Sequence, residues 1–88
     1  MKKELLLEEL RDACSHIGLT LRFEKGDFRG GWCVLHDKNV LVVNKRFSIE
    51  RKNSTIARAL GELGIDVMYL KPAVRDFIED ELARVTEE

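Results

Sequence analysis

Residues 39–64 constrain the fold of this chain more than any other stretch. Residues 40–43 form an unbroken apolar run between two asparagines, which predicts a buried strand. Ser48 is a natural N-cap for the segment that follows, because its hydroxyl can accept a hydrogen bond from the exposed backbone N–H groups of a first helical turn. The helical pattern then ends at Gly64, which suits the C′ position. The stretch therefore predicts a strand, a short basic turn and a helix.

The N-terminal part of the chain predicts one helix and one further strand. Apolar residues recur at helical spacing over Lys3–His16, and Gly18 is well placed to end that helix. Residues 19–25 alternate cleanly between apolar and polar types, as a half-buried strand does. The glycine-rich residues 26–31 that follow are expected to form a loop.

The remaining segments complete one domain, spanning residues 1–88. Residues 32–36 and 39–44 are expected to form a hairpin with apolar side chains on both faces, so we expect helices on both sides of the sheet. Residues 65–70 are either a fourth strand or an extended crossing, and Pro72 opens a third helix. The predicted class is α+β: a three- or four-stranded, mostly antiparallel sheet packed with three helices. The predicted order is helix, three strands, helix, optional strand and helix.

Composition excludes several classes of protein. The chain has 88 residues, 44% of them hydrophobic, and no apolar run approaches the roughly 18 residues that a membrane-spanning helix needs. We expect no secretory leader in the first residues, because three leucines are followed at once by acids. Cys14 and Cys33 are expected to be free thiols in a reducing compartment, which predicts a cytoplasmic protein. We expect no cofactor.

Charge is unevenly distributed along the chain. Between residues 38 and 58, six basic residues stand against one acid, whereas residues 76–88 are strongly acidic. The net charge of −1 argues against nucleic acid as a partner, and the two segments are expected to face each other or solvate opposite sides. A basic ridge remains an alternative nucleic-acid or anion site, and it consists of Lys45, Arg46, Arg51, Lys52 and Arg58.

Residues 18–64 carry a recognisable pattern. Four features follow one another here: a strand ending in Val-Asn, a turn, a seryl N-cap, and a helix that reads Thr-Ile-Ala-Arg-Ala-Leu-Gly-Glu-Leu over residues 55–63. This order resembles the ImmA/IrrE family of zincin-like metallopeptidases, whose helix reads Thr-Leu-Ala-His-Glu-Leu-Gly-His-Leu. The resemblance implies a zincin-like framework in which one helix carries the chemistry.

The residues of the catalytic signature are absent from this helix. In H-E-x-x-H, two histidines one turn apart bind Zn²⁺ and the glutamate acts as general base. Here the two ligand positions are Arg58 and Glu62, and the general-base position is Ala59. Arginine is permanently cationic and repels a metal, and alanine cannot move a proton. We therefore expect a vestigial site without metal or catalytic residues, in which Arg58 and Glu62 pair four residues apart.

The sequence leaves several functions open. The leading expectation is a non-enzymatic binding or regulatory protein that takes a protein or peptide partner by strand addition, or pairs with a second copy as a homodimer. Trp32 and the basic residues Lys45, Arg46, Arg51 and Lys52 are candidates for partner contacts. The alternatives are a metal-dependent hydrolase with atypical ligands, Glu62 and Asp66, and a nucleic-acid-binding protein that uses the basic ridge.

Overall fold

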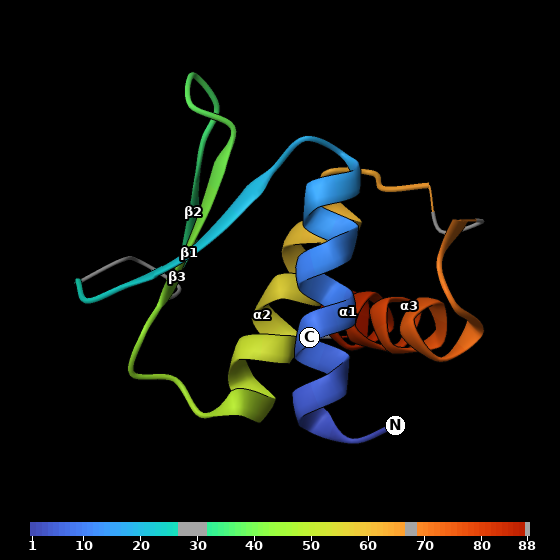
Figure 1. Cartoon of the computed structure of the whole chain (residues 1–88). Coiled ribbons are helices and arrows are strands. Elements are labelled where there is room, and N and C mark those ends of the chain that lie inside the picture. Colours follow the sequence, from blue (N-terminus) through green and yellow to red (C-terminus); the bar gives the residue numbers. More distant parts are fainter. Residues whose placement is uncertain (27–31, 67–68, 88) are drawn as a thin grey trace.

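The protein folds as three helices against one sheet. The computed structural model describes residues 1–26, 32–66 and 69–87, with side chains as far as Arg84. Within these residues a three-stranded mixed sheet packs with three helices in the order α-β-β-β-α-α (Figure 1). The α+β class is confirmed. The described residues of the optional fourth strand, 65–66 and 69–70, contain no strand, and of the predicted loop at 26–31 only Gly26 is described.

Helix α1, Lys3–His16, ends in a Schellman motif. Gly18 has φ +77°, and its N–H donates to the Ser15 carbonyl at 2.9 Å. The N–H of Leu19 donates to the Cys14 carbonyl, also at 2.9 Å. These two bonds satisfy carbonyls that the end of a helix would leave unpaired, and the positive φ explains why glycine is needed.

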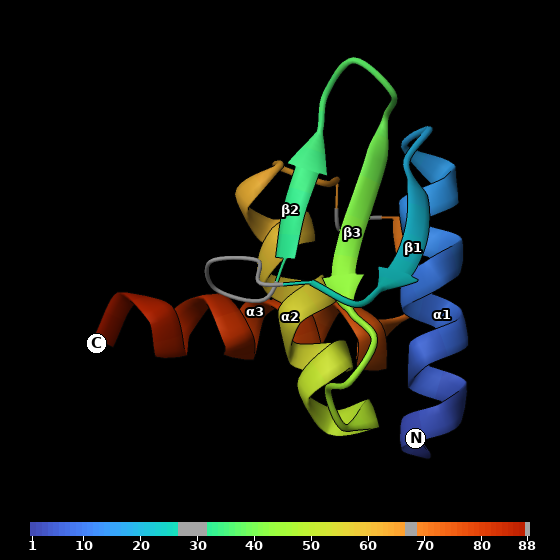
Figure 2. The same ribbon diagram turned by 90° about the vertical axis from the view of Figure 1, so that its left-hand side faces the viewer.

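The sheet has one parallel and one antiparallel pairing. Strand β3, Val40–Asn44, lies in the middle, with β1, Thr20–Glu24, parallel on one side and β2, Trp32–Leu35, antiparallel on the other (Figure 2). The predicted hairpin between β2 and β3 is confirmed. The chain passes from β1 to the far edge of the sheet before the hairpin returns β3 to the centre, and this makes β1 and β3 parallel.

All three helices lie on one face of the sheet (Figures 1 and 2). The expectation of helices on both faces is therefore wrong. Val40 and Val42 point to the open face yet are only 8% and 2% exposed. In the sheet register Val42 lies between Arg22 and Cys33. Neighbouring side chains on adjacent strands can therefore shield a central strand without a helix above it.

Helix α2, Ile49–Glu62, is the central helix, packed between the sheet, α1 and α3. The Ser48 hydroxyl accepts a hydrogen bond from the Arg51 N–H at 3.2 Å, which confirms the predicted N-cap. Gly64, with φ +76°, donates to the Gly61 carbonyl at 3.1 Å, in a second Schellman motif. The core joins α2 to the sheet and both other helices, and its fully buried large side chains include Leu10, Leu41, Ile56, Leu60 and Ile78.

Helix α3, Pro72–Glu87, crosses α2 at close range. A Cβ placed on Gly61 would lie 2.5 Å from Leu82 Cδ2, so a larger residue at this position would require the Leu82 side chain to move. Val74 and Ile78 of α3 are buried, as the predicted apolar stripe requires. Pro72 begins the helix, where its missing N–H has no cost.

Candidate functional site

The three positions expected to form a vestigial site, Arg58, Ala59 and Glu62, lie in the C-terminal half of α2. Ala59 is fully buried, and Glu62 is exposed. Arg58 does not pair with Glu62 as expected: its Nε lies 3.5 Å from Oε2 of Glu81 on α3. The pairing with Glu62 is therefore wrong, because helix packing presents a buried carboxylate that is distant in sequence.

Glu81 is the buried centre of a charge cluster between α2 and α3. Its side chain is 4% exposed, and it lies near two guanidinium groups, with Arg84 Nη1 at 3.4 Å from Oε1. The Ser54 hydroxyl donates to the same oxygen at 3.2 Å. A buried carboxylate needs such partners, since an unpaired buried charge is strongly unfavourable. The cluster joins two helices and directs the Arg58 guanidinium toward α3.

The donors for a metal site are not brought together. Within residues 1–26, 32–66 and 69–84, no group of three or more histidine, cysteine, aspartate or glutamate side chains could hold a metal ion. Asp66 lines two of the pockets described below, whereas Glu62 lines neither of them. Cys14 is buried, and this desolvation raises the pKa of its thiol to about 11. The thiol therefore stays protonated at neutral pH, in which form it is neither a good ligand nor a nucleophile.

A hollow of about 310 Å³ opens beside the β2–β3 hairpin, lined by both apolar and polar residues, and we call it the hairpin pocket. Val34 and His36 border it on the hairpin side, and Leu63 and Ile65 border it at the C-terminal end of α2. Ile17 lines it from the end of α1. Ile17 and Leu63 are each 41% exposed, although helical spacing predicts Leu63 on the inner face of its helix. That part of the prediction is wrong, because α2 ends at Glu62 and Leu63, as its C-cap residue, borders the hairpin pocket.

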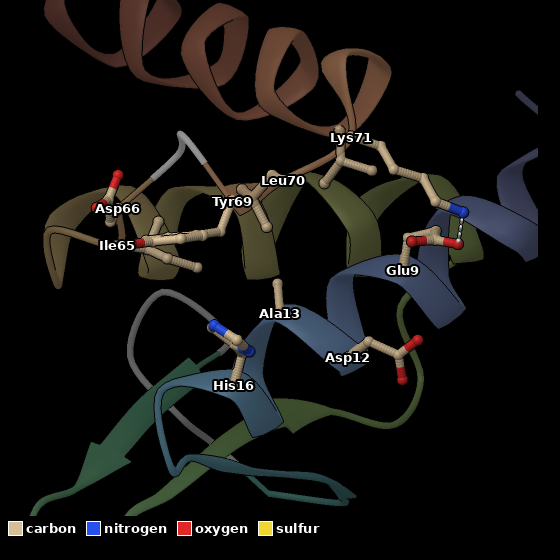
Figure 3. A pocket seen from close by; sticks show the side chains of 10 residues that line it. Glu9, Asp12, Ala13, His16, Ile65, Asp66, Tyr69, Leu70 and Lys71 are labelled. Atoms are coloured by element: carbon tan, nitrogen blue, oxygen red, sulfur yellow. Dashed lines mark hydrogen bonds and ion pairs between the residues drawn. The ribbon is translucent and has the colours of Figure 1, made fainter.

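A second hollow, the helix pocket, lies between α1 and the segment that leads into α3 (Figure 3). It measures about 190 Å³ and shares Ile65 and Asp66 with the hairpin pocket. His16 projects from α1 toward Tyr69, with ring centroids 6.0 Å apart, and Tyr69 is 75% exposed. Lys71 donates to Glu9 at 2.7 Å across the hollow, and this hydrogen bond raises the pKa of Lys71. The two pockets make one hollowed surface.

The predicted basic ridge is divided among separate environments. Arg51 lies over the Phe47 ring at 3.9 Å, and Lys52 lies over the Phe23 ring at 4.7 Å. Arg46 lines a third pocket at the end of the sheet, which is considered below. Arg58 is turned toward α3 and does not belong to this surface. Glu50, the one acid of residues 38–58, is paired elsewhere, with Lys3 at 2.8 Å.

The sequence identified Trp32 as a candidate contact residue but did not predict the pockets. Trp32 is half-buried and packs against the core from the start of β2. The hairpin pocket was not predicted, although one signal was available: Ile17 and Leu63 each directly precede the glycine that ends a helix. An apolar residue in the last position before such a glycine can extend past the core.

Comparison with models of protein families, with curated proteins and with solved structures finds no match to this chain. Among the described helices, none is long and apolar enough to cross a membrane.

Proposed function

We propose that this protein is a non-enzymatic binding domain that holds an extended segment of a partner protein along the free edge of β2. One apolar side chain of that segment enters the hairpin pocket. The observation that carries the proposal is that an unpaired strand edge lies beside a hollow in which two apolar side chains, Ile17 and Leu63, are exposed. Binding of this kind would regulate the partner without changing it chemically.

The edge of β2 supplies the main-chain part of this interaction. Within the described part of the chain β2 pairs only with β3, so one row of its backbone groups has no partner in the sheet. The opposite edge, β1, has α1 packed beside it (Figure 2). An unpaired edge can accept an extended peptide as an added strand. The more open edge of this sheet is therefore that of β2.

The hairpin pocket supplies the side-chain part. Val34 lies on the helix side of β2, so a strand added at its edge would place alternate side chains over the same hollow. Six large apolar side chains are exposed in the described residues, and Ile17, Leu63 and Tyr69 line the hollowed surface. Clustered exposed apolar side chains are typical of interaction sites. The occupant that fits is an extended peptide with a large apolar side chain.

The vestigial positions support a function without catalysis. Ala59 is buried in the core, and the Arg58 guanidinium is directed to Glu81, so neither position is arranged for metal ligation or proton transfer. This arrangement fits a degenerate relative of the ImmA/IrrE family in which the framework persists and the chemistry does not. Both cysteines are free, which fits action in the reducing environment of the cytoplasm.

A peptide-display selection on the full chain tests the proposal. Peptides selected from a random library are measured for affinity to the wild-type protein and to two variants, Leu63→Lys and Leu5→Lys. The two leucines are 41% and 45% exposed, both lie at helix ends, and only Leu63 lines the hairpin pocket. We expect Leu63→Lys to weaken binding about tenfold or more, because the apolar contact it removes contributes roughly 1.5 kcal/mol or more.

The control and the opposing outcomes are distinct. Leu5→Lys should leave the affinity within about twofold of wild type, since this position is far from the hollow. Selection of no peptide, or equal loss of affinity in both variants, would contradict the proposal. Concentration-dependent dimers that Leu63→Lys abolishes would assign the edge to a second copy of the chain instead of a partner protein.

A further inference from the structure

A third hollow lies where the parallel strands β1 and β3 end, and we call it the strand-end pocket. It measures about 250 Å³ and is lined by Lys25, Gly26, Asn44 and Arg46. Glu24 and Asn44 are partners in the register, so both strands leave the sheet at the same end. The chain after β1 crosses toward β2, whereas the chain after β3 leads into α2 (Figure 2). Adjacent parallel strands whose connections diverge leave a crevice in which ligands bind in other open sheets.

The lining of this pocket is cationic. Lys25 and Arg46 supply two positive charges, and none of the described residues that line the pocket is acidic. The backbone N–H of Arg46 donates to Asn44 Oδ1 at 2.9 Å. This bond folds the chain back after β3 and keeps the arginine beside the asparagine. With its oxygen occupied, Asn44 retains two side-chain N–H groups that can donate to a ligand.

The carboxylates that the structure describes near this pocket do not neutralise these cations. Glu24 pairs with Arg22 at 2.9 Å, on the open face of the sheet. Within residues 1–26, 32–66 and 69–84, no carboxylate forms an ion pair with Lys25 or Arg46. Two adjacent cations without an acidic partner among the described residues, in a hollow that also offers amide donors, produce a local positive potential that favours an anion.

We propose that the strand-end pocket binds the phosphate group of a small phosphorylated molecule. The Arg46 guanidinium matches the geometry of phosphate oxygens, Lys25 adds a point charge, and Asn44 donates hydrogen bonds. The pocket holds more than a single anion, so part of the attached molecule also fits. A nucleic-acid strand is disfavoured, because polymer binding depends on many phosphate contacts and this pocket has two cations on a chain of net charge −1.

This site is independent of the proposed peptide site. The hairpin pocket is bordered by Leu19 and Asn39, which directly precede β1 and β3, whereas the strand-end pocket lies where those strands finish. The two pockets are thus at opposite ends of the same strands. Loss of one function by substitution should leave the other intact, so each can fail separately.

Titration of the full-length, ¹⁵N-labelled protein tests the inference. The probes are inorganic phosphate, a nucleoside monophosphate and a single-stranded DNA oligonucleotide, each added at constant ionic strength with chloride as the reference anion. We expect saturable shifts of the Asn44 and Arg46 amides with both small phosphates. Arg46→Gln should weaken that binding tenfold or more. Lys38→Gln, an exposed lysine in the hairpin turn at the far end of β3, should change it less than twofold.

Two results would overturn the inference. Shifts that do not saturate, or that Arg46→Gln and Lys38→Gln reduce equally, would mean general screening and no site. Binding of DNA alone, lost steeply as salt rises, would assign the cations to nucleic acid instead of a small phosphate. Circular dichroism of each variant confirms that the fold is intact, and both positions are exposed, so either substitution should be tolerated.

Discussion

The ion pair between α2 and α3, in which the carboxylate is buried and the guanidinium is partly exposed, gives the sharpest prediction on stability. Glu81 is 3% exposed, and its carboxylate faces Arg58 at 3.5 Å, with Ser54 and Arg84 as further partners. We consider the variants Arg58→Met and Glu81→Met, alone and together. Methionine preserves much of the side-chain volume in each case, so the comparison isolates charge from packing.

The structure sets the expected magnitudes. Arg58→Met leaves the buried carboxylate with two partners in place of three, and an under-satisfied buried charged group costs about 1–3 kcal/mol or more. Glu81→Met leaves a guanidinium that is 37% exposed and can turn to solvent, so its cost is expected to be smaller, about 1 kcal/mol. Replacing both charges by apolar groups is often near neutral. The double variant should therefore lose less stability than the two single variants lose in total, by at least about 1 kcal/mol.

Urea denaturation followed by far-UV circular dichroism measures these free energies of unfolding. Arg84→Met is the matched control: its side chain is 70% exposed and touches the same carboxylate, so it should cost less than about 1 kcal/mol. Effects of Arg58→Met and Glu81→Met that add to within about 0.5 kcal/mol would refute the reasoning, since residues in one cluster should couple.

Four further predictions concern single elements. Burial raises the pKa of the Cys14 thiol from 9.0 to about 11, so as the pH rises the unfolded chain loses that proton first. The free energy of unfolding, measured by urea titration, should therefore fall by about 2–3 kcal/mol between these pH values. The Cys14→Ala variant should not show this loss. At neutral pH an alkylating reagent should modify the half-exposed Cys33 and spare Cys14 until the protein unfolds, as mass spectrometry can show. Gly61→Ala should destabilise the protein by about 1–3 kcal/mol in thermal denaturation, because the added methyl group meets the Leu82 side chain. A smaller loss when the same substitution is made in a Leu82→Ala variant would confirm that contact. Ser48→Ala should cost about 1 kcal/mol by the same measurement, through loss of the N-cap hydrogen bond; an unchanged melting temperature would contradict that role.

Local signals in the sequence were enough to place the helices and strands. Ser48, Gly18, Gly64 and Pro72 mark helix ends because capping chemistry acts within one turn and is written in adjacent residues. The alternation of residues 19–25 likewise reports a strand without knowledge of its neighbours. Features determined by a few consecutive residues can be read directly from the chain.

Long-range packing could not be predicted in the same way. The parallel partner of β1 and the placement of all helices on one face depend on how the chain returns after β2, which no periodicity encodes. The Arg58–Glu81 pair joins residues 23 positions apart, whereas sequence spacing favoured Glu62. The hairpin pocket arises because two helices end at the same level beside the hairpin, and this also requires the tertiary fold.

The most direct test of the central proposal is the position of a selected peptide on the protein, measured by NMR contacts between the peptide backbone and the strands. The account predicts contacts from the peptide to the backbone of β2, together with contacts from one apolar peptide side chain to Val34 and Leu63. A peptide that binds instead beside β1 or on α3, with no contact to β2, would contradict it.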